Sequence, residues 1–131
     1  MHSFRTTSWM VNIVLIEAQK RHAKRVARVE VDLGKLVCFN PAQLKSVFVQ
    51  LLEDTVADNA EIIIHTIDPE IKCNQCGRNG DLPLRKSETF DVQIASLTCP
   101  DCGASDVDIT KGKECRIAGI GMVLPSSTDF Y

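Results

Sequence analysis

The chain has 131 residues, 44% of them hydrophobic and 24% charged, a composition typical of a soluble globular protein and too apolar for a disordered one. Its formal net charge of -2 and aromatic content of 5% give no indication of a nucleic-acid or membrane surface. No apolar stretch approaches the roughly 20 residues of a transmembrane helix, and the N-terminus shows no secretory signal. We therefore expect a cytoplasmic protein whose six cysteines bind metal before they form disulfides.

The first third of the chain carries the patterns of a helix and a strand. Residues from about Thr7 to His22 place apolar side chains on one broad face and end in a basic cluster, which complements the negative end of a helix dipole. Residues Arg25 to Leu33 alternate between apolar and charged side chains. This alternation predicts a half-buried strand, which Gly34 ends.

A second helix and a second strand follow. Asn40 and Pro41 predict the helix start, because asparagine caps free backbone amides and proline suits the first helical position. From Leu44 to Leu52, apolar residues recur at helical spacing, so one face is expected to be buried. Glu61 to Ile67 is predicted to be a strand, and its three consecutive isoleucines indicate a central, well-covered position in the sheet.

The composition changes at Pro69. From there to about Lys111, turns and cysteines dominate, and such a segment needs a metal to hold it together because it cannot build its own hydrophobic core. Glu114 to Leu124 is predicted to be a last strand, in which Gly119 and Gly121 mark a bulge or a close backbone approach.

These elements predict an α+β fold in which two helices lie on a small three-stranded sheet and a zinc-ribbon-like module is inserted before the last strand. The predicted domain boundaries place an α/β domain at residues 1–68 plus 112–124 and the zinc-ribbon module at residues 69–111. The polar residues 125–131 are expected to form a flexible tail.

Two C-x-x-C-G motifs lie within the inserted segment. They consist of Cys73, Cys76 and Gly77, and of Cys99, Cys102 and Gly103. Two intervening residues allow both thiolates of one turn to reach the same ion, and the glycine allows a left-handed turn whose amides point at the sulfurs. Two such turns supply the four thiolates of a closed, structural zinc site with no position left for catalysis.

Four cysteines at this spacing also occur in other kinds of site. An iron or iron–sulfur site would use the same four ligands, so the sequence does not exclude it. Thioredoxin-like chemistry would need one C-x-x-C between a strand and a helix, which fits poorly. Cys38 and Cys115 lie outside the motifs and are predicted to be buried core residues.

The N-terminus offers a second, different metal site. Methionine aminopeptidase requires a small second residue, so we expect Met1 to remain in front of His2. The Met1 amine has a pKa of about 8. Together with the backbone amide and the imidazole Nδ1 of His2, it can close adjacent chelate rings around one metal ion. Nitrogen sets of this kind suit Ni(II) or Cu(II). His22 and His65 have no comparable context and are expected at a helix end and on a strand surface.

Together these features resemble the HypA/HybF family, the nickel metallochaperones of [NiFe]-hydrogenase maturation. The likeness covers nearly the whole chain. It is carried by Met1-His2, the segment 19–33, the turn 32–36, the segment 56–61, both cysteine motifs and the segment 111–114.

The resemblance implies a nickel site at Met1, His2 and Ser3, with Ni²⁺ as transferred cargo and Zn²⁺ as a structural ion. The implied partners are a maturation GTPase of the HypB type and a hydrogenase large subunit, and the implied function is ion transfer without enzymatic catalysis. Most family members have glutamate where this chain has Ser3, and some place a histidine between the cysteine motifs, where this chain has none. We therefore expect weaker nickel binding than in a member with both groups.

Two competing hypotheses come from other classes. A zinc-ribbon adaptor that has lost or altered nickel delivery would bind a protein partner. Binding of nucleic acid by the ribbon is disfavoured, because its basic residues, among them Arg78, Arg85, Lys86 and Lys111, are outnumbered by acidic residues, among them those at positions 81, 88, 91, 101, 106 and 108. A redox enzyme would require cysteine thiols that react in the metal-loaded protein.

Overall fold

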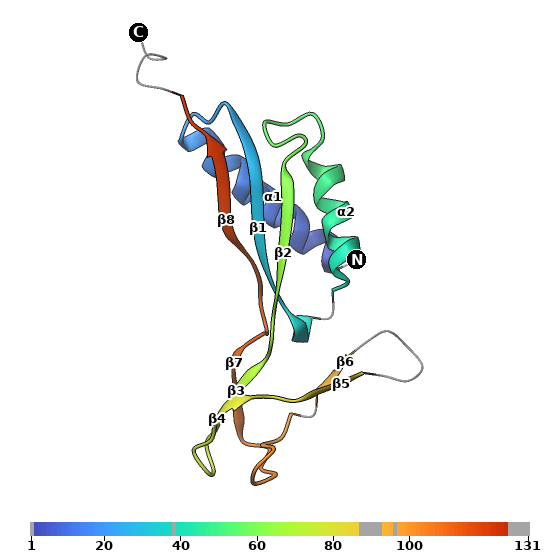
Figure 1. Ribbon diagram of the computed structural model, residues 1–131, viewed down its shortest axis with the longest axis vertical. Helices are drawn as coiled ribbons and strands as arrows, with labels where there is room; N and C mark the ends of the chain where they lie inside the picture. Colours follow the sequence, from blue (N-terminus) through green and yellow to red (C-terminus); the bar gives the residue numbers. More distant parts are fainter. Residues whose placement is uncertain (1, 38, 87–92, 96, 126–131) are drawn as a thin grey trace. The chain divides into compact units, whose positions relative to one another are not determined.

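The computed structural model describes residues 2–37, 39–86, 93–95 and 97–125 (Figure 1). The chain divides into two compact units. The first comprises Met1–Asp32, Phe39–His65 and Arg116–Tyr131, and the second comprises Leu33–Cys38 and Thr66–Cys115. The domain boundaries expected from the sequence stay a prediction, and residues 126–131 of the expected tail lie outside the described residues.

Helix α1 (His2–Lys20) begins five residues earlier than predicted. Thr7, the predicted start, lies within the helix, and its side chain is fully buried. It lies one turn before Met10 and on the same face of the helix as Val14, which are also fully buried. The helix ends where His22 adopts a φ of 54°. The amide of His22 then donates to the carbonyl of Gln19 at 3.2 Å, and that of Ala23 to the carbonyl of Ala18 at 2.9 Å, a pattern typical of a left-handed helix end.

Helix α2 (Pro41–Leu52) confirms the predicted start. The side chain of Asn40 accepts hydrogen bonds from the amides of Ala42 at 2.9 Å and Gln43 at 3.2 Å, while Pro41 occupies the first turn. The residues that the helix buries fall four apart along one face. They are Leu44, Phe48 and Leu52.

The first unit contains a three-stranded sheet in the order β2-β1-β8, formed by β1 (Arg25–Gly34), β2 (Glu61–Ile67) and β8 (Cys115–Val123). Strands β1 and β2 run in the same direction and are joined through α2, whereas β8 runs in the opposite direction, and both helices cover one face of the sheet (Figure 1). Two helices on a three-stranded sheet confirm the predicted α+β class.

The prediction that β2 is central was wrong, because β2 is an edge strand and β1 is the centre. Of the three consecutive isoleucines only Ile62 is buried, while Ile63 and Ile64 are half-buried. The apolar run is therefore explained by partial burial of side chains on both faces of β2, although β2 has only one neighbouring strand. A Cβ atom added at Gly119 or Gly121 of β8 would lie 3.1 Å from side-chain atoms of Glu30 or Arg28 on β1, so the close contacts are with side chains and the predicted bulge or close backbone approach stays a prediction.

The second unit consists of short strands. Strands β4 (Asn79–Asp81), β3 (Glu70–Cys73) and β7 (Val107–Lys111) form an antiparallel sheet with β3 in the centre, and β5 (Leu84–Lys86) pairs with β6 (Gln93–Ala95). A short 3-10 helix (Lys35–Val37) also belongs to this unit.

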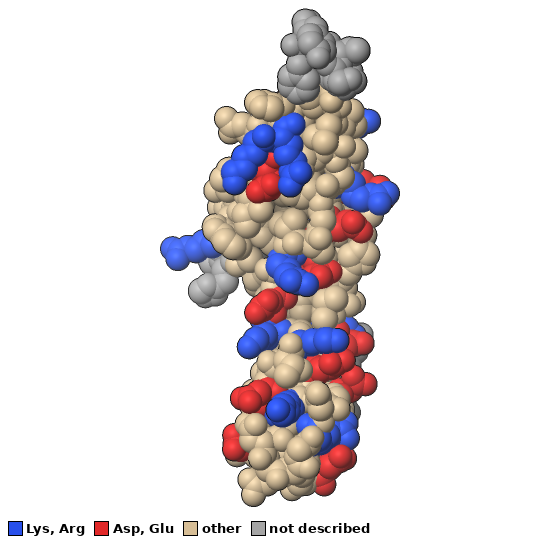
Figure 2. All heavy atoms as spheres, turned by 90° about the vertical axis from the view of Figure 1, so that its left-hand side faces the viewer, with Lys and Arg blue, Asp and Glu red and all other residues tan. Residues whose placement is uncertain are grey.

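The molecular surface carries both signs of charge. Figure 2 shows lysine and arginine side chains interleaved with aspartate and glutamate over the visible face, without a continuous region of one sign. In the described residues neither helix has the length and hydropathy needed to cross a membrane.

Candidate metal centre

The two cysteine motifs fold into the same turn twice. In the first, the amide of Gly77 donates to the carbonyl of Cys73 at 3.1 Å, and the amide of Cys73 to the carbonyl of Arg78 at 2.7 Å. In the second, Gly103 donates to Cys99 at 2.8 Å and Cys99 to Ala104 at 2.9 Å. Each turn thus has one cysteine at its start, held by two backbone hydrogen bonds.

Both glycines adopt the left-handed conformation that the motif predicts. Their φ angles are 79° at Gly77 and 75° at Gly103. A Cβ atom at either position would meet no atom within 4 Å, so the backbone conformation, and not lack of space, requires glycine. The turn then allows amides to point at sulfur. Both the Gln75 and the Cys76 amides lie 3.4 Å from the Sγ atom of Cys73.

The four cysteines predicted as zinc ligands meet at one point. Their Sγ atoms all lie within 4.8 Å of one another, and the pairs Cys73–Cys102 and Cys76–Cys99 are each 3.6 Å apart. A tetrahedral zinc ion with bonds of about 2.3 Å holds its sulfurs about 3.8 Å apart. The arrangement therefore fits a zinc ion bound by four sulfurs, and it is far wider than the 2.05 Å of a disulfide bond.

The thiol pKa values show why such a cluster needs a cation. The backbone amides of Cys102 and Asp101 lower the pKa of Cys99 to about 7, against desolvation. The amide of Ala104 lowers the pKa of Cys102, but desolvation and the three neighbouring sulfurs outweigh it and raise the pKa to about 12. Four thiolates at this separation repel one another, so all four ionise together only around a positive ion.

Side chains next to the four cysteines hold the two motifs in place, and sequence reasoning missed them. The side chain of Asn74 donates to Asp106 at 3.1 Å and to Asp108 at 3.2 Å, which attaches the first motif to β7. Arg78 forms an ion pair of 3.0 Å with Asp101 of the second motif. Asn74, Arg78 and Asp101 could have been identified from the sequence, because they lie inside or directly after the C-x-x-C-G motifs. Residues next to metal ligands commonly orient those ligands.

Comparison with known proteins agrees with this architecture over nearly the whole chain. A family model described as "Hydrogenase/urease nickel incorporation, metallochaperone, hypA" matches residues 1–122. The chain is 34% identical over 121 residues to the hydrogenase maturation factor HypA of Caldanaerobacter subterraneus subsp. tengcongensis, covering 92% of this chain and 97% of that protein. It is 33% identical over 132 residues to the HypA of Thermococcus gammatolerans, covering 92% and 94%.

The chain belongs to the HypA family. The solution structure of the Ni metallochaperone HypA from Helicobacter pylori shares its fold, with a TM-score of 0.66 at 21% identity over 94% of this chain and 98% of that one. Membership of this family makes the chain a metallochaperone of nickel incorporation in hydrogenase maturation. It does not favour the alternative of a zinc-ribbon adaptor.

The residues predicted to bind nickel in this HypA family member lie at the start of α1. His2 and Ser3 belong to the first turn of that helix, and Met1 and the side chains of both lie outside the described parts of the chain. The other histidines lie apart from this turn. His22 follows the end of α1, and exposed His65 pairs with Glu30 at 3.2 Å on the sheet.

Two further cysteines, Cys38 and Cys115, lie outside the C-x-x-C-G motifs. Cys115 is half-buried at the start of β8, and desolvation raises the pKa of its thiol, so this thiol stays protonated at neutral pH. Cys38 lies outside the described residues, so its predicted core position stays a prediction.

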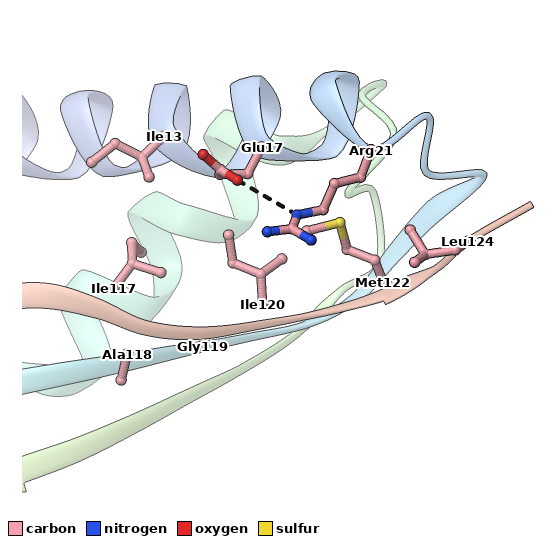
Figure 3. Close-up of a pocket in the computed structure, with 9 residues that line it drawn as sticks. All are labelled: Ile13, Glu17, Arg21, Ile117, Ala118, Gly119, Ile120, Met122 and Leu124. Carbon is pink, nitrogen blue, oxygen red and sulfur yellow. Dashed lines mark ion pairs between the residues drawn. The ribbon is translucent and has the colours of Figure 1, made fainter.

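A cleft of about 470 Å³ lies between α1 and β8 in the first unit (Figure 3). Ile117 and Ile120 project from β8 toward α1, while Ala118 points to the opposite side of the strand (Figure 3). Within the lining, the Glu17 carboxylate is engaged with Arg21 at 3.6 Å. In the described part of the chain, groups of three or more potential metal ligands occur only at the four cysteines, so the described lining of the cleft holds no such group.

Proposed function

We propose that this HypA family member binds one Ni(II) ion at its N-terminus and passes it to a hydrogenase large subunit in the cytoplasm, together with a HypB-type GTPase. The nickel ligands are the Met1 amine, the amide and imidazole of His2, and the backbone amide of Ser3. The protein performs no covalent chemistry on a substrate. Its action is the transfer of an ion from one ligand set to another.

The observation that supports this proposal is the start of α1 at His2. The first four amides of a helix have no carbonyl partner within the helix, so the amides of His2 and Ser3 are available to a metal without the loss of a helical hydrogen bond. A bare cation is disfavoured at the positive end of a helix dipole. Loss of amide protons on chelation removes that conflict, since it makes the nickel complex nearly neutral.

The four-sulfur site supports the proposal by exclusion. All four positions of a tetrahedral ion are taken by Cys73, Cys76, Cys99 and Cys102, which leaves no open position for exchange. Zinc would therefore hold the second unit together, whereas cargo requires a site that opens. We assign the four sulfurs to Zn²⁺ and the nitrogen set at Met1 and His2 to Ni²⁺.

A titration of zinc-loaded protein with Ni(II) tests this assignment. We expect about one nickel per chain and the absorption band of planar nickel in the wild type. The His2→Ala variant should lose both signals, and so should a protein whose Met1 amine is blocked by acetylation. Metal analysis of the same wild-type sample distinguishes zinc from iron at the four sulfurs.

His65→Ala is the matched control, because it removes an exposed histidine whose Glu30 partner lies in the sheet of the first unit. We expect unchanged nickel uptake in this variant. Equal nickel uptake by wild type and His2→Ala would contradict the N-terminal site. Transfer can then be followed by adding purified large subunit and GTPase to the nickel-loaded protein, where His2→Ala should deliver no nickel.

A further inference from the structure

Arg78 connects the two cysteine motifs. It follows Gly77 of the first motif, and its Nη1 atom lies 3.0 Å from a carboxylate oxygen of Asp101, one of the two residues between the cysteines of the second motif. Its Nη2 atom also donates to the carbonyl of Asp81 in β4 at 3.3 Å. One guanidinium group thus bridges three segments of the second unit.

The remaining donor of this guanidinium has no protein partner. Arg78 Nε is buried and makes no hydrogen bond with the described residues. A buried donor without a partner is destabilising and rare, so it calls for a partner that the protein atoms do not supply. The hydrogen bond that Arg78 donates to Asp101 raises the pKa of Arg78, and the nearby charge of Cys99 adds to this increase, so the guanidinium stays charged.

The charge of the loaded site favours a neighbouring cation. Four thiolates around one divalent cation leave a net charge of about -2. Such a charge in a partly desolvated turn is stabilised by a neighbouring cation and by N–H groups that point at sulfur. Two backbone amides already serve Cys73 in this way. Arg78 adds a full positive charge near Cys99 of the second motif.

We propose that Arg78 is a positioning residue of the metal site: it ties the second motif to the first through Asp101, and its charge stabilises the metal-bound thiolates. Arginine suits this task better than lysine, because its planar group contacts the Asp101 carboxylate and the Asp81 carbonyl at the same time. The inference rests on the proposed zinc assignment of the four sulfurs.

Other ion pairs of the second unit lack these properties. Lys111 pairs with Glu70 at 3.5 Å across neighbouring strands, but 61% of its side chain is exposed, against 29% for Arg78. Exposed pairs of this kind contribute little to stability. Lys111 therefore provides the matched control for removal of one cation from the same unit.

The test compares wild type, Arg78→Met, Arg78→Lys and Lys111→Met as full-length zinc proteins. Zinc affinity is measured by competition with a chromophoric chelator, and the ligand field by the absorption of the cobalt-substituted protein. We expect Arg78→Met to bind zinc about 10- to 100-fold more weakly and to shift the sulfur-to-cobalt charge-transfer band, as for other residues that orient metal ligands. Arg78→Lys should recover only part of the affinity, and Lys111→Met should stay within about twofold of wild type.

Zinc affinity of Arg78→Met within twofold of wild type, or an equal loss in Lys111→Met, would overturn the inference. Full recovery by Arg78→Lys would overturn the role assigned to the planar guanidinium group. Should Arg78→Met fail to fold, Asp101→Asn keeps the arginine and removes only its anchor, and it should weaken zinc binding in the same direction by a smaller factor. Failure of the zinc assignment itself would appear in the wild type, as a metal content other than one zinc per chain.

Discussion

The two units of this chain reach a stable structure by different means. The first unit buries large apolar side chains from both helices and the sheet, among them Met10, Phe48 and Val29, all fully buried. The second unit buries fewer large apolar side chains, Leu33, Ile71 and Leu82, and its other buried residues include two cysteines of the four-sulfur cluster. Hydrophobic burial therefore explains the first unit, and the second unit depends on its metal.

This difference extends to the ends of the local elements. In the first unit a side chain, that of Asn40, satisfies the free amides at the start of α2. In the second unit the amides of the cysteine turns point at sulfur or at nearby carbonyls. Amides that point at sulfur are useful only when the sulfur carries a charge, which again connects this unit to its ion. The predictions below separate the two mechanisms.

Removal of zinc should have the largest effect. Zinc binding to small four-ligand modules provides on the order of 10 kcal/mol of apparent folding free energy, so a strong chelator should unfold the second unit. Hydrogen exchange followed by mass spectrometry should show loss of protection in β3, β4 and β7, with α1 and α2 still protected. Protection should return when zinc is added back. Loss of protection in the helices on chelation would contradict the separate stability of the first unit.

Phe48→Ala should act on the opposite unit. Phe48 is the largest fully buried side chain, and its truncation in a core costs about 3–5 kcal/mol, a large part of the stability of a small domain. Urea unfolding followed by helical circular dichroism should move to a much lower midpoint, while zinc affinity stays unchanged. The control is Val49→Ala on the next residue, whose side chain is 48% exposed. A loss of zinc affinity in Phe48→Ala equal to that of a cysteine variant would show that the two units unfold together.

The contrast between the units also explains which features the sequence predicts. The four metal ligands and the left-handed glycines follow from local spacing, because a C-x-x-C-G turn is specified by five consecutive residues. The start of α2 is likewise local, since Asn40 and Pro41 act on the first turn of the helix. Features of this kind need no knowledge of what packs against them.

Features that depend on distant neighbours were less accessible. The isoleucine run of β2 indicated a central strand, but the order of strands is a property of the whole sheet, in which β1 takes the centre. Helix α1 begins before Thr7, whose side chain is buried in the core, and the sequence before Thr7 contains no capping residue that would have predicted this start. The pairing of Arg78 with Asp101 joins residues 23 positions apart and depends on how two turns meet.

Asn40→Ala should have the smallest effect and the most confined one. The Asn40 side chain accepts hydrogen bonds from the amides of Ala42 and Gln43, and loss of such a cap costs about 1 kcal/mol. Asn40→Asp keeps an acceptor at the same position and should restore most of the lost stability, as measured by thermal unfolding. Zinc affinity should remain equal to that of wild type in both variants, because the cap acts on the hydrophobic unit alone. A cap variant that released zinc would instead show that folding of the first unit determines the geometry of the four sulfurs.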